Sequence, residues 1–264
     1  MKIASWNVNS VGARLPRVLD WFRAAEPDVC VLQEIKCVDE KFPAEAFEDL
    51  GYNCYVYGQK SYNGVALLSK HPAEDVIRGL PGFEDENSRY IEALIVPEDA
   101  EAVRVGGLYL PNGNPAPGPK YDYKLAWMEA FERHAARLLE DEESFVLAGD
   151  YNVIPEPSGV YAPDRWVDDA LFRLESRQAY RRILNHGLTD ALPHLIGHDY
   201  YTFWDYQRGA WGKNNGLRID HLLLSPQAAD RLEGGGVDAD VRDPEQGDGS
   251  CKPSDHVPVW VELG

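Results

Sequence analysis

Nine short apolar segments, each ending in turn residues, run through the whole sequence, and they constrain the fold more than any other feature. Val, Ile, Leu and Tyr are frequent in these segments, and runs of this length and composition are typical of β-strands. Strands this numerous bury their apolar faces best as two sheets packed together. The predicted strands cover residues 2–8, 28–34, 52–58, 64–70, 90–96, 103–110, 144–150, 219–225 and 257–263.

Two other stretches repeat apolar residues at helical spacing and predict two amphipathic helices. Because each helix has one apolar face, we expect both helices to cover the outside of the packed sheets. The sequence therefore predicts an α/β fold, a four-layered α/β sandwich with strands outnumbering helices. The apolar positions are Leu15, Val18, Leu19 and Phe22 in the first helix and Leu125, Met128, Phe131, Ala135 and Leu138 in the second.

The chain of 264 residues exceeds the commonest domain size, but large two-sheet sandwiches reach this length as one domain. No internal repeat or linker divides it, and we expect a single domain over residues 1–264. Three segments rich in Pro or Gly, at 111–119, 234–236 and 243–253, are predicted to be surface loops. Substrate contacts are often placed on such loops.

Composition indicates a protein that folds without disulfides. Apolar residues make up 44% of the chain, enough for an extensive core. The four cysteines are scattered, without the spacing of a zinc site or a disulfide framework, which favours a reducing compartment. The first residues lack the features of a signal peptide, and no apolar run reaches membrane-spanning length. We expect a cytoplasmic protein with no membrane partner.

The net charge of −18 argues against nonspecific binding of a polyanion, because phosphate contacts need Lys or Arg. The net charge does not exclude specific binding of a polyanion. A protein can contact such a partner through one face, and a bound cation can offset carboxylates within a site.

Acid, amide and histidine side chains recur where the predicted strands begin or end. If these ends meet at one edge of the sandwich, they offer oxygen ligands suited to Mg²⁺, with no thiolate or paired histidines for zinc. Phosphodiester hydrolysis needs groups of these kinds. A side chain must orient and activate the attacking water, and hydrogen-bond donors must stabilise the negative charge that grows on the phosphoryl oxygens. The residues are Asn7, Glu34, Asp150, Asn152, Asp220, Asp255 and His256.

Each of these residues also has an ordinary structural interpretation. Glu34 could be a solvated residue at a strand end, and the GDYN sequence around Asp150 could be a plain turn. His256 could simply pack at the start of a strand. Asp220 is more telling, because a carboxylate inside an apolar strand must find a partner, and a histidine is the natural one.

Six motifs, taken in order, resemble the exonuclease III family of abasic-site (AP) endonucleases, within the endonuclease/exonuclease/phosphatase superfamily. They are WNVNS, LQE, LYLPNG, GDYN, LRIDHLLLS and PSDHVPV, and residues 58–70 also look like a hairpin of this family. The resemblance covers nearly the full length. It implies a DNase I-like fold with two mixed β-sheets packed face to face and helices outside.

The resemblance also implies roles for the metal-binding residues. Glu34 would hold Mg²⁺, for which Mn²⁺ is a possible substitute, with Asn7 and Asp255 as supporting ligands or hydrogen-bonding partners. Asp150 would activate the attacking water, and Asn152 would position Asp150 and the phosphate, both near the metal. Asn9 stands where other members carry an acid, which leaves Glu34 and Asp255 as the expected metal carboxylates.

A second group would act on the substrate. By the same resemblance, Tyr109 and Asn112 would contact the phosphate or the leaving oxygen. His256 would donate to a phosphoryl oxygen while Asp220 holds its ring in one tautomer. The structural alternatives are that Tyr109 is an ordinary core residue and that Asn112 is an ordinary turn residue.

The family places a pocket for the base-free sugar within residues 201–223, and a sugar without its base enters it after flipping out. The alternative is a core aromatic cluster. Some relatives carry tryptophan where Leu217 stands, so the pocket here is less aromatic. The pocket candidates are Phe203, Trp204, Leu217 and Ile219, and Arg89, Lys213 and Lys252 are candidates for contacts with phosphate, or else ordinary surface charges.

The expected function is a Mg²⁺-dependent DNA phosphodiesterase of base excision repair. It would incise 5′ to abasic sites, act as a 3′-to-5′ exodeoxyribonuclease, or trim 3′ ends. Its partner would be double-stranded DNA with abasic sites or 3′ ends, bound by a monomer. The alternatives are a metal-dependent hydrolase of the same fold acting on RNA, a phosphoinositide or another lipid, and a binding module without activity.

Overall fold

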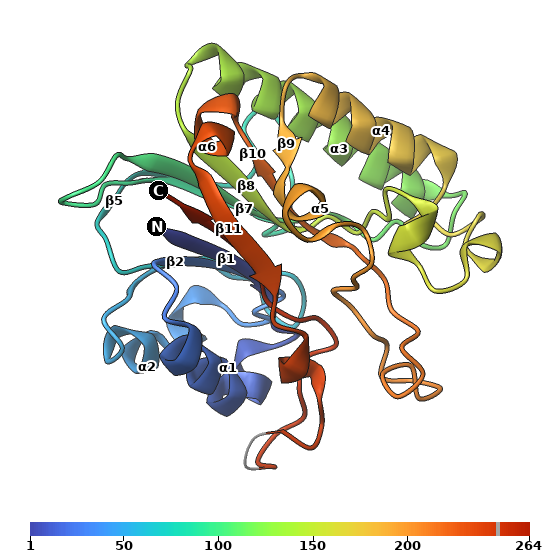
Figure 1. Cartoon of the computed structure of the whole chain (residues 1–264), viewed down its shortest axis with the longest axis horizontal. Coiled ribbons are helices and arrows are strands. Elements are labelled where there is room, and N and C mark those ends of the chain that lie inside the picture. The colour runs from blue at the N-terminus through green and yellow to red at the C-terminus, as the bar shows by residue number, and fades with distance from the viewer. Residues whose placement is uncertain (247–248) are drawn as a thin grey trace.

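The chain forms two six-stranded mixed sheets that pack face to face (Figure 1), and the computed structural model describes residues 1–246 and 249–264. The first sheet has the order β11 (Leu232–Val237), β12 (Val259–Leu263), β1 (Lys2–Asn7), β2 (Val29–Gln33), β4 (Val65–Ser69), β3 (Asn53–Tyr57). The second has the order β5 (Ala73–Arg78), β6 (Tyr90–Ile95), β7 (Val103–Tyr109), β8 (Phe145–Asp150), β10 (Asp220–Leu224), β9 (Thr189–Asp190).

Each sheet has one parallel pair next to its centre. β1 runs parallel to β2 and antiparallel to β12, and β7 runs parallel to β8 while β10 pairs with β8 in the antiparallel sense. The carboxyl ends of β1, β2, β7 and β8 carry Asn7, Gln33, Tyr109 and Asp150. The parallel pairs therefore deliver polar side chains to one edge of each sheet.

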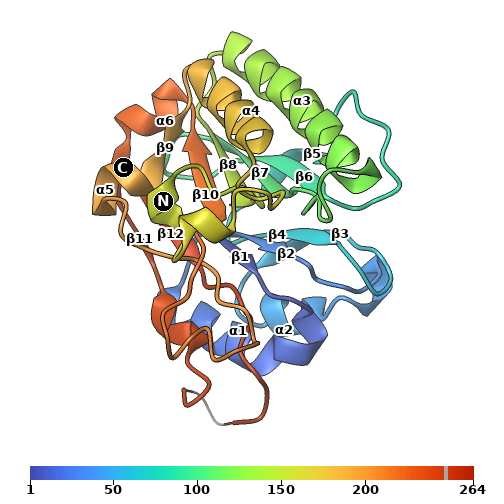
Figure 2. The ribbon, with the colours of Figure 1, turned by 90° about the vertical axis from the view of Figure 1, so that its right-hand side faces the viewer.

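Helices form the two outer layers (Figure 2). The aromatic face of α1 (Val11–Ala25), with Trp21 and Phe22, is buried on the first sheet together with α2 (Ala44–Glu48). On the second sheet, α3 (Pro119–Glu140) and α4 (Leu174–Asn185) pack in the same way. The remaining elements are α5 (Ala191–Ile196), α6 (Pro226–Asp230) and the 3₁₀ turns η1 (Asp39–Lys41), η2 (Pro157–Gly159), η3 (Pro163–Arg165) and η4 (Ala239–Arg242).

All nine predicted strands and both predicted helices are confirmed, and so is the four-layered α/β sandwich. The prediction of a surface loop at 234–236 is wrong, because these glycines lie inside β11, at the edge of the first sheet. Gly235 sits so close to Leu195 of α5 and to the backbone of Trp260 that a Cβ atom would clash. In the predicted loop at 243–253, residues 247 and 248 lie outside the described residues.

No helix among residues 1–246 and 249–264 is both long enough and apolar enough to cross a membrane.

β2 of the first sheet packs against β7 of the second. Gly107 of β7 faces Val31 of β2, and a Cβ atom at position 107 would lie 2.7 Å from Val31 Cγ1. Both residues belong to the apolar layer between the sheets, where each strand contributes fully buried side chains. The missing side chain of Gly107 thus sets how near the two sheets can approach.

We expect Gly107→Ala to destabilise the fold by about 1–3 kcal/mol, because the added methyl group overpacks the layer between the sheets. Urea unfolding followed by circular dichroism measures this loss. Gly212→Ala is the control, since a Cβ atom at that exposed loop position meets nothing within 4 Å. Equal unfolding midpoints for the two variants would show that a methyl group at position 107 does not overpack the contact between β2 and β7.

Candidate active site

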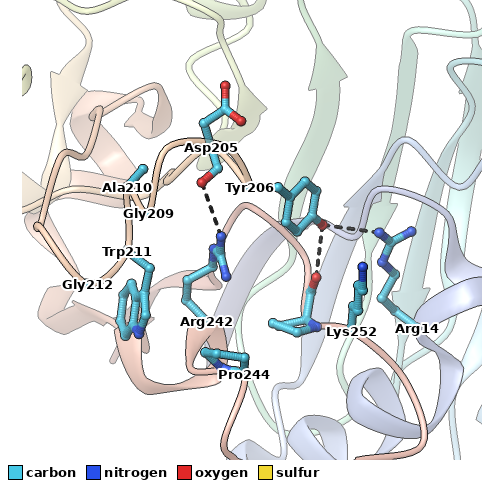
Figure 3. Close-up of a pocket in the computed structure, with 11 residues that line it drawn as sticks. Arg14, Asp205, Tyr206, Gly209, Ala210, Trp211, Gly212, Arg242, Pro244 and Lys252 are labelled. Atoms are coloured by element: carbon cyan, nitrogen blue, oxygen red, sulfur yellow. Dashed lines mark hydrogen bonds between the residues drawn. The ribbon is translucent and has the colours of Figure 1, made fainter.

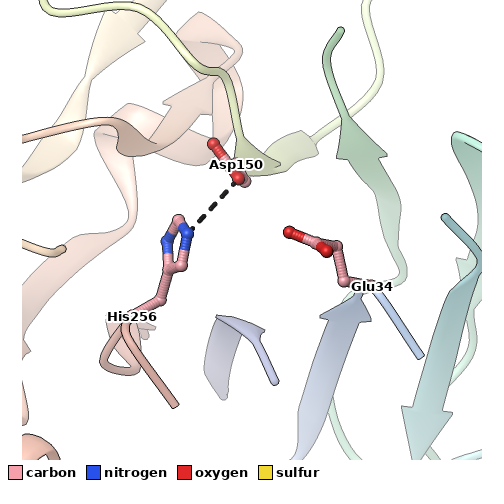
Figure 4. Close-up of side chains that lie close together, drawn as sticks. All are labelled: Glu34, Asp150 and His256. Atoms are coloured by element: carbon pink, nitrogen blue, oxygen red, sulfur yellow. Dashed lines mark ion pairs between the residues drawn. The ribbon is translucent and has the colours of Figure 1, made fainter. Parts of the chain in front are cut away.

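Three side chains from different strand ends converge at one edge of the sandwich (Figure 4). Glu34 follows β2, Asp150 ends β8, and His256 precedes β12. One potential ligand atom from each lies within 4.8 Å of the others. The sheet crossing thus brings together residues separated by more than 200 positions in the sequence.

The amide of Asn7, at the end of β1, links the two carboxylates. Its Nδ2 donates to Glu34 Oε1 at 2.9 Å and to Asp150 Oδ2 at 3.0 Å, and the side chain is fully buried. Its Oδ1 accepts from the backbone N–H of Asn9 at 3.0 Å. Each polar atom of the Asn7 amide is therefore used, which fixes its orientation.

Glu34 sits in a left-handed backbone conformation, with φ of 50°. Its Oε2 lies 2.8 Å from Lys36 Nζ, which also donates to Asn9 Oδ1. Burial opposes ionisation of Glu34, but Lys36, the Asn7 amide and His256 together lower the pKa of this carboxyl below its usual value. Glu34 is therefore an anion at neutral pH.

Asp150 is almost fully buried and lies among other charged groups. Its Oδ1 accepts from the backbone N–H of Asn152 at 2.9 Å, and its Oδ2 lies 3.6 Å from His256 Nε2. Burial raises the pKa of Asp150 to about 7; His256 opposes this rise, while the Asp220 carboxylate adds to it. A carboxyl poised in this range can accept a proton near neutral pH.

His256 and Asp220 form a buried pair. The imidazole Nδ1 lies 2.9 Å from Asp220 Oδ2, which also accepts from Thr202 Oγ1 at 2.6 Å. Burial disfavours the charged imidazole, but the carboxylates of Asp220 and Asp150 prevail and raise the pKa of His256 to about 10. The histidine partner predicted for Asp220 is therefore His256.

A second set of side chains lies around Tyr109. Tyr109, at the end of β7, is half-buried, and the Arg89 guanidinium stacks on its ring at 4.8 Å. Burial, with Glu34 and Asp150 nearby, raises the pKa of Tyr109 well above its usual value, so the hydroxyl keeps its proton. The Asn112 amide is exposed and donates to Asn152 Oδ1 at 3.2 Å.

A cavity of about 280 Å³ borders the site. Phe203 and Leu217 line it together with Trp166, and the Phe203 ring packs edge-on against His256 at 4.9 Å. Two other pocket candidates lie outside its lining. Trp204 is buried with its Nε1 donating to Asn214 Oδ1, and Ile219 is buried in the apolar cluster that also contains Leu217.

Asp255 is also not part of the converging group among the described residues. Its Oδ1 accepts from Asn9 Nδ2 at 3.1 Å, so it supports the neighbouring loop. Besides Arg89, two cations were candidates for contacts with phosphate. Lys213 is exposed and donates to the backbone of Arg208, and Lys252 lines a different cavity.

Three residues that the sequence interpretation missed hold the site together. Lys36 pairs with Glu34, Thr202 binds Asp220, and the buried Lys124 donates to the backbone oxygens of the Asn112 and Asn152 positions. Only Lys36 had a local signal, because it follows Glu34 by two residues. Thr202 lies 18 positions from Asp220, and Lys124 lies 12 and 28 positions from Asn112 and Asn152.

We expect Asp220→Asn to lower the pKa of His256 from about 10, because it removes the carboxylate nearest to the imidazole. Imidazole NMR titration in EDTA measures this change. Because the pKa of His256 is raised in the folded protein, protonation of this imidazole stabilises the wild-type fold. This stabilisation is complete below about pH 6.5 and is lost as the pH rises towards 10. An unchanged titration in the variant would contradict the pairing.

The matched family model is described as the Endonuclease/Exonuclease/phosphatase family and covers residues 4–256. The chain is 34% identical to exodeoxyribonuclease III of Haemophilus influenzae over the full length of both proteins. It also resembles two solved structures. One, from Neisseria, is a 3′ phosphatase bound to a product DNA hairpin, with 37% identity and a TM-score of 0.93. The other is an AP endonuclease from Archaeoglobus fulgidus, with 34% identity and a TM-score of 0.92.

Both structural alignments cover 100% of this chain and 99% of the solved one. The similarity therefore extends over both sheets and all the strand ends that form the site. The chain belongs to the endonuclease/exonuclease/phosphatase family and, within it, to the exonuclease III group of hydrolytic nucleases.

Proposed function

We propose that this chain is a Mg²⁺-dependent DNA phosphodiesterase of base excision repair, which incises 5′ to abasic sites and removes nucleotides or blocking groups from 3′ ends. The observation that carries the proposal is the convergence of Glu34, Asp150 and the Asp220–His256 pair beside a cavity lined by Phe203. The names of its relatives, which include an exodeoxyribonuclease III and an AP endonuclease, support the DNA substrate.

The donor set fits a divalent cation that prefers oxygen ligands. Glu34 and Asp150 offer carboxylate oxygens, and only one imidazole and no thiolate lies with them. When bound, Mg²⁺ or its substitute Mn²⁺ supplies positive charge against the phosphoryl oxygens. Glu34 would be its main ligand, while the Asn7 and Asn152 amides act through their hydrogen bonds to the carboxylates and backbone.

The protein side chains divide the remaining chemistry. Asp150 orients a water and takes its proton as the water attacks the phosphorus, while the bond from the phosphorus to the leaving oxygen of the strand breaks and that oxygen gains a proton from solvent. The Asp220 carboxylate accepts the Nδ1–H of His256, which leaves Nε2–H to donate to a phosphoryl oxygen. Tyr109 and Asn112 also bind the phosphate, and the Arg89 guanidinium stacks on the tyrosine ring.

The cavity beside His256 supplies the damage recognition. Phe203 and Leu217 give it apolar walls next to the reacting phosphate, suited to a deoxyribose that has lost its base. Because both sheets contribute residues to one site, we propose that residues 1–264 act as a single domain. One copy carries every proposed catalytic group, which is consistent with a monomer.

The experiment that tests this function uses a labelled duplex with one abasic-site analogue, with Mg²⁺ or with EDTA, beside an undamaged duplex with recessed 3′ ends. We expect Mg²⁺-dependent incision 5′ to the lesion. Shortening of the undamaged duplex alone would make the protein primarily an exonuclease. Cleavage of neither DNA, with phosphate released from a phosphoinositide or with RNA cleaved, would overturn the DNA substrate.

We expect His256→Ala and Asp220→Asn each to lower kcat about 10²- to 10⁴-fold, because either change removes the oriented proton donor. Single-turnover cleavage of the abasic duplex measures the loss, and circular dichroism checks that both variants fold. Asp230→Asn, on the separate short helix α6, is the matched control. Wild-type rates in either site variant would rule out the proposed donor role.

We expect Glu34→Gln to raise the Mg²⁺ concentration for half-maximal cleavage at least about tenfold, since it removes a charged ligand. Titrating Mg²⁺ at fixed DNA concentration measures this shift. The control is Glu40→Gln, an exposed acid in η1. An unchanged Mg²⁺ requirement in Glu34→Gln would exclude this carboxylate as the metal ligand.

A further inference from the structure

A second and larger cavity, of about 630 Å³, opens beside the site (Figure 3). One wall is the loop 205–212, and the other is formed by η4 and the segment that leads to His256. Arg14 of α1 closes one end. No group of the proposed reaction lies in its lining.

The charge of this cavity is opposite to that of the whole chain. Three cations line it, Arg14, Arg242 and Lys252, in a protein with a net charge of −18. The single acid in the lining is Asp205, whose carboxylate points away from Arg242 in Figure 3 and accepts from the backbone N–H of Gln207. The cavity is therefore suited to an anion.

Two of the three cations are held in place by the protein. Arg242 donates to the backbone oxygens of Trp204 and Asp205, and Arg14 donates to the Tyr206 hydroxyl at 3.1 Å. Lys252 is exposed and makes no hydrogen bond or ion pair with residues 1–246 and 249–264. Fixed guanidinium groups beside a free ammonium group make a preorganised site for a phosphate.

The same cavity offers an aromatic surface. Trp211 is half-buried and packs edge-on against Trp204 at 4.9 Å, which holds its ring in position. The Arg242 guanidinium lies 5.9 Å from the Trp211 ring and 5.1 Å from the Tyr206 ring. A flat ring next to fixed cations suits a ligand that combines a planar base with a phosphate.

Both walls of the cavity continue directly into the candidate active site. The loop 205–212 starts two residues after Phe203, which packs on His256. The other wall ends at Pro253, whose backbone oxygen accepts from the Tyr206 hydroxyl at 2.9 Å. The cavity is therefore adjacent to the candidate active site, where the DNA is proposed to bind.

We propose that this cavity is a nucleotide-binding subsite next to the reaction centre. Arg14 and Lys252 bind a phosphate, and Trp211 stacks on the base attached to it. The subsite rests on the proposed DNA substrate, and its ligand is a nucleotide unit, either within the bound strand or as a free deoxynucleoside monophosphate. It binds independently of the metal, because no residue in its lining belongs to the converging acids.

The test measures binding in EDTA, where cleavage is absent, for a labelled duplex with a recessed 3′ end and separately for free dAMP. We expect Lys252→Gln to weaken duplex binding and to reduce the slope of log Kd against log salt by about one. Trp211→Leu should weaken binding about fivefold or more with the slope unchanged, and Trp211→Phe should restore most of it. Arg133→Gln, on the outer face of α3, is the matched charge control.

The two arms separate the sources of the nucleotide. Losses in the duplex arm alone assign the subsite to the strand, and parallel losses for dAMP assign it to the free nucleotide as well. If wild type binds the duplex but Lys252→Gln and Trp211→Leu match Arg133→Gln in both arms, the subsite is overturned while the proposed function stands. If wild type binds neither ligand, both are overturned.

Discussion

The buried amide of Asn7 is the interaction on which the site depends. Its Nδ2 donates to Glu34 after β2 in one sheet and to Asp150 of β8 in the other. Two carboxylates so close would repel each other and splay apart without a shared donor. The amide can reach both because β1 and β2 pack against β8 across the two sheets, and the close contact between Gly107 and Val31 belongs to the same packed layer. Packing between the sheets and the geometry of the reacting groups are therefore one constraint.

The electrostatics of the site follow from which carboxylates have a cation of their own. Glu34 has Lys36 at 2.8 Å, and Asp220 has the imidazole of His256 at 2.9 Å. Asp150 is left with a longer 3.6 Å approach to the same imidazole. Burial, which His256 opposes, raises the pKa of Asp150 to about 7, so this carboxyl can accept a proton near neutral pH.

Much of the fold and of the site could be predicted from the sequence, because both are encoded locally. The nine strands have continuous apolar runs, and residues such as Asp150 and His256 stand at recognisable strand ends. β11 was missed because its three glycines were interpreted as a loop, whereas the close packing of Gly235 against α5 leaves no room for a side chain at that position.

The partners of the predicted residues were harder to find. Thr202 and Lys124 touch the site only because distant segments fold together, and no local pattern marks them. Trp204 and Asp255 stand beside Phe203 and His256 in the sequence, but in the fold Trp204 donates to Asn214 and Asp255 accepts from Asn9. These contacts depend on how distant segments fold together, so the sequence does not show them, and the roles predicted for the two residues stay predictions.

The order in which strands join the first sheet has a consequence for synthesis on the ribosome. β1 pairs with β2 on one side and with β12 on the other, so β1 cannot complete its pairing until residues 259–263 have been made. His256 stands just before β12 and lies beside Asp150 in the folded protein. A nascent chain in which β12 is still inside the ribosome already contains Glu34, Asp150 and Asp220. Its site is not yet assembled, so we expect the growing polypeptide to be inactive until β12 pairs with β1.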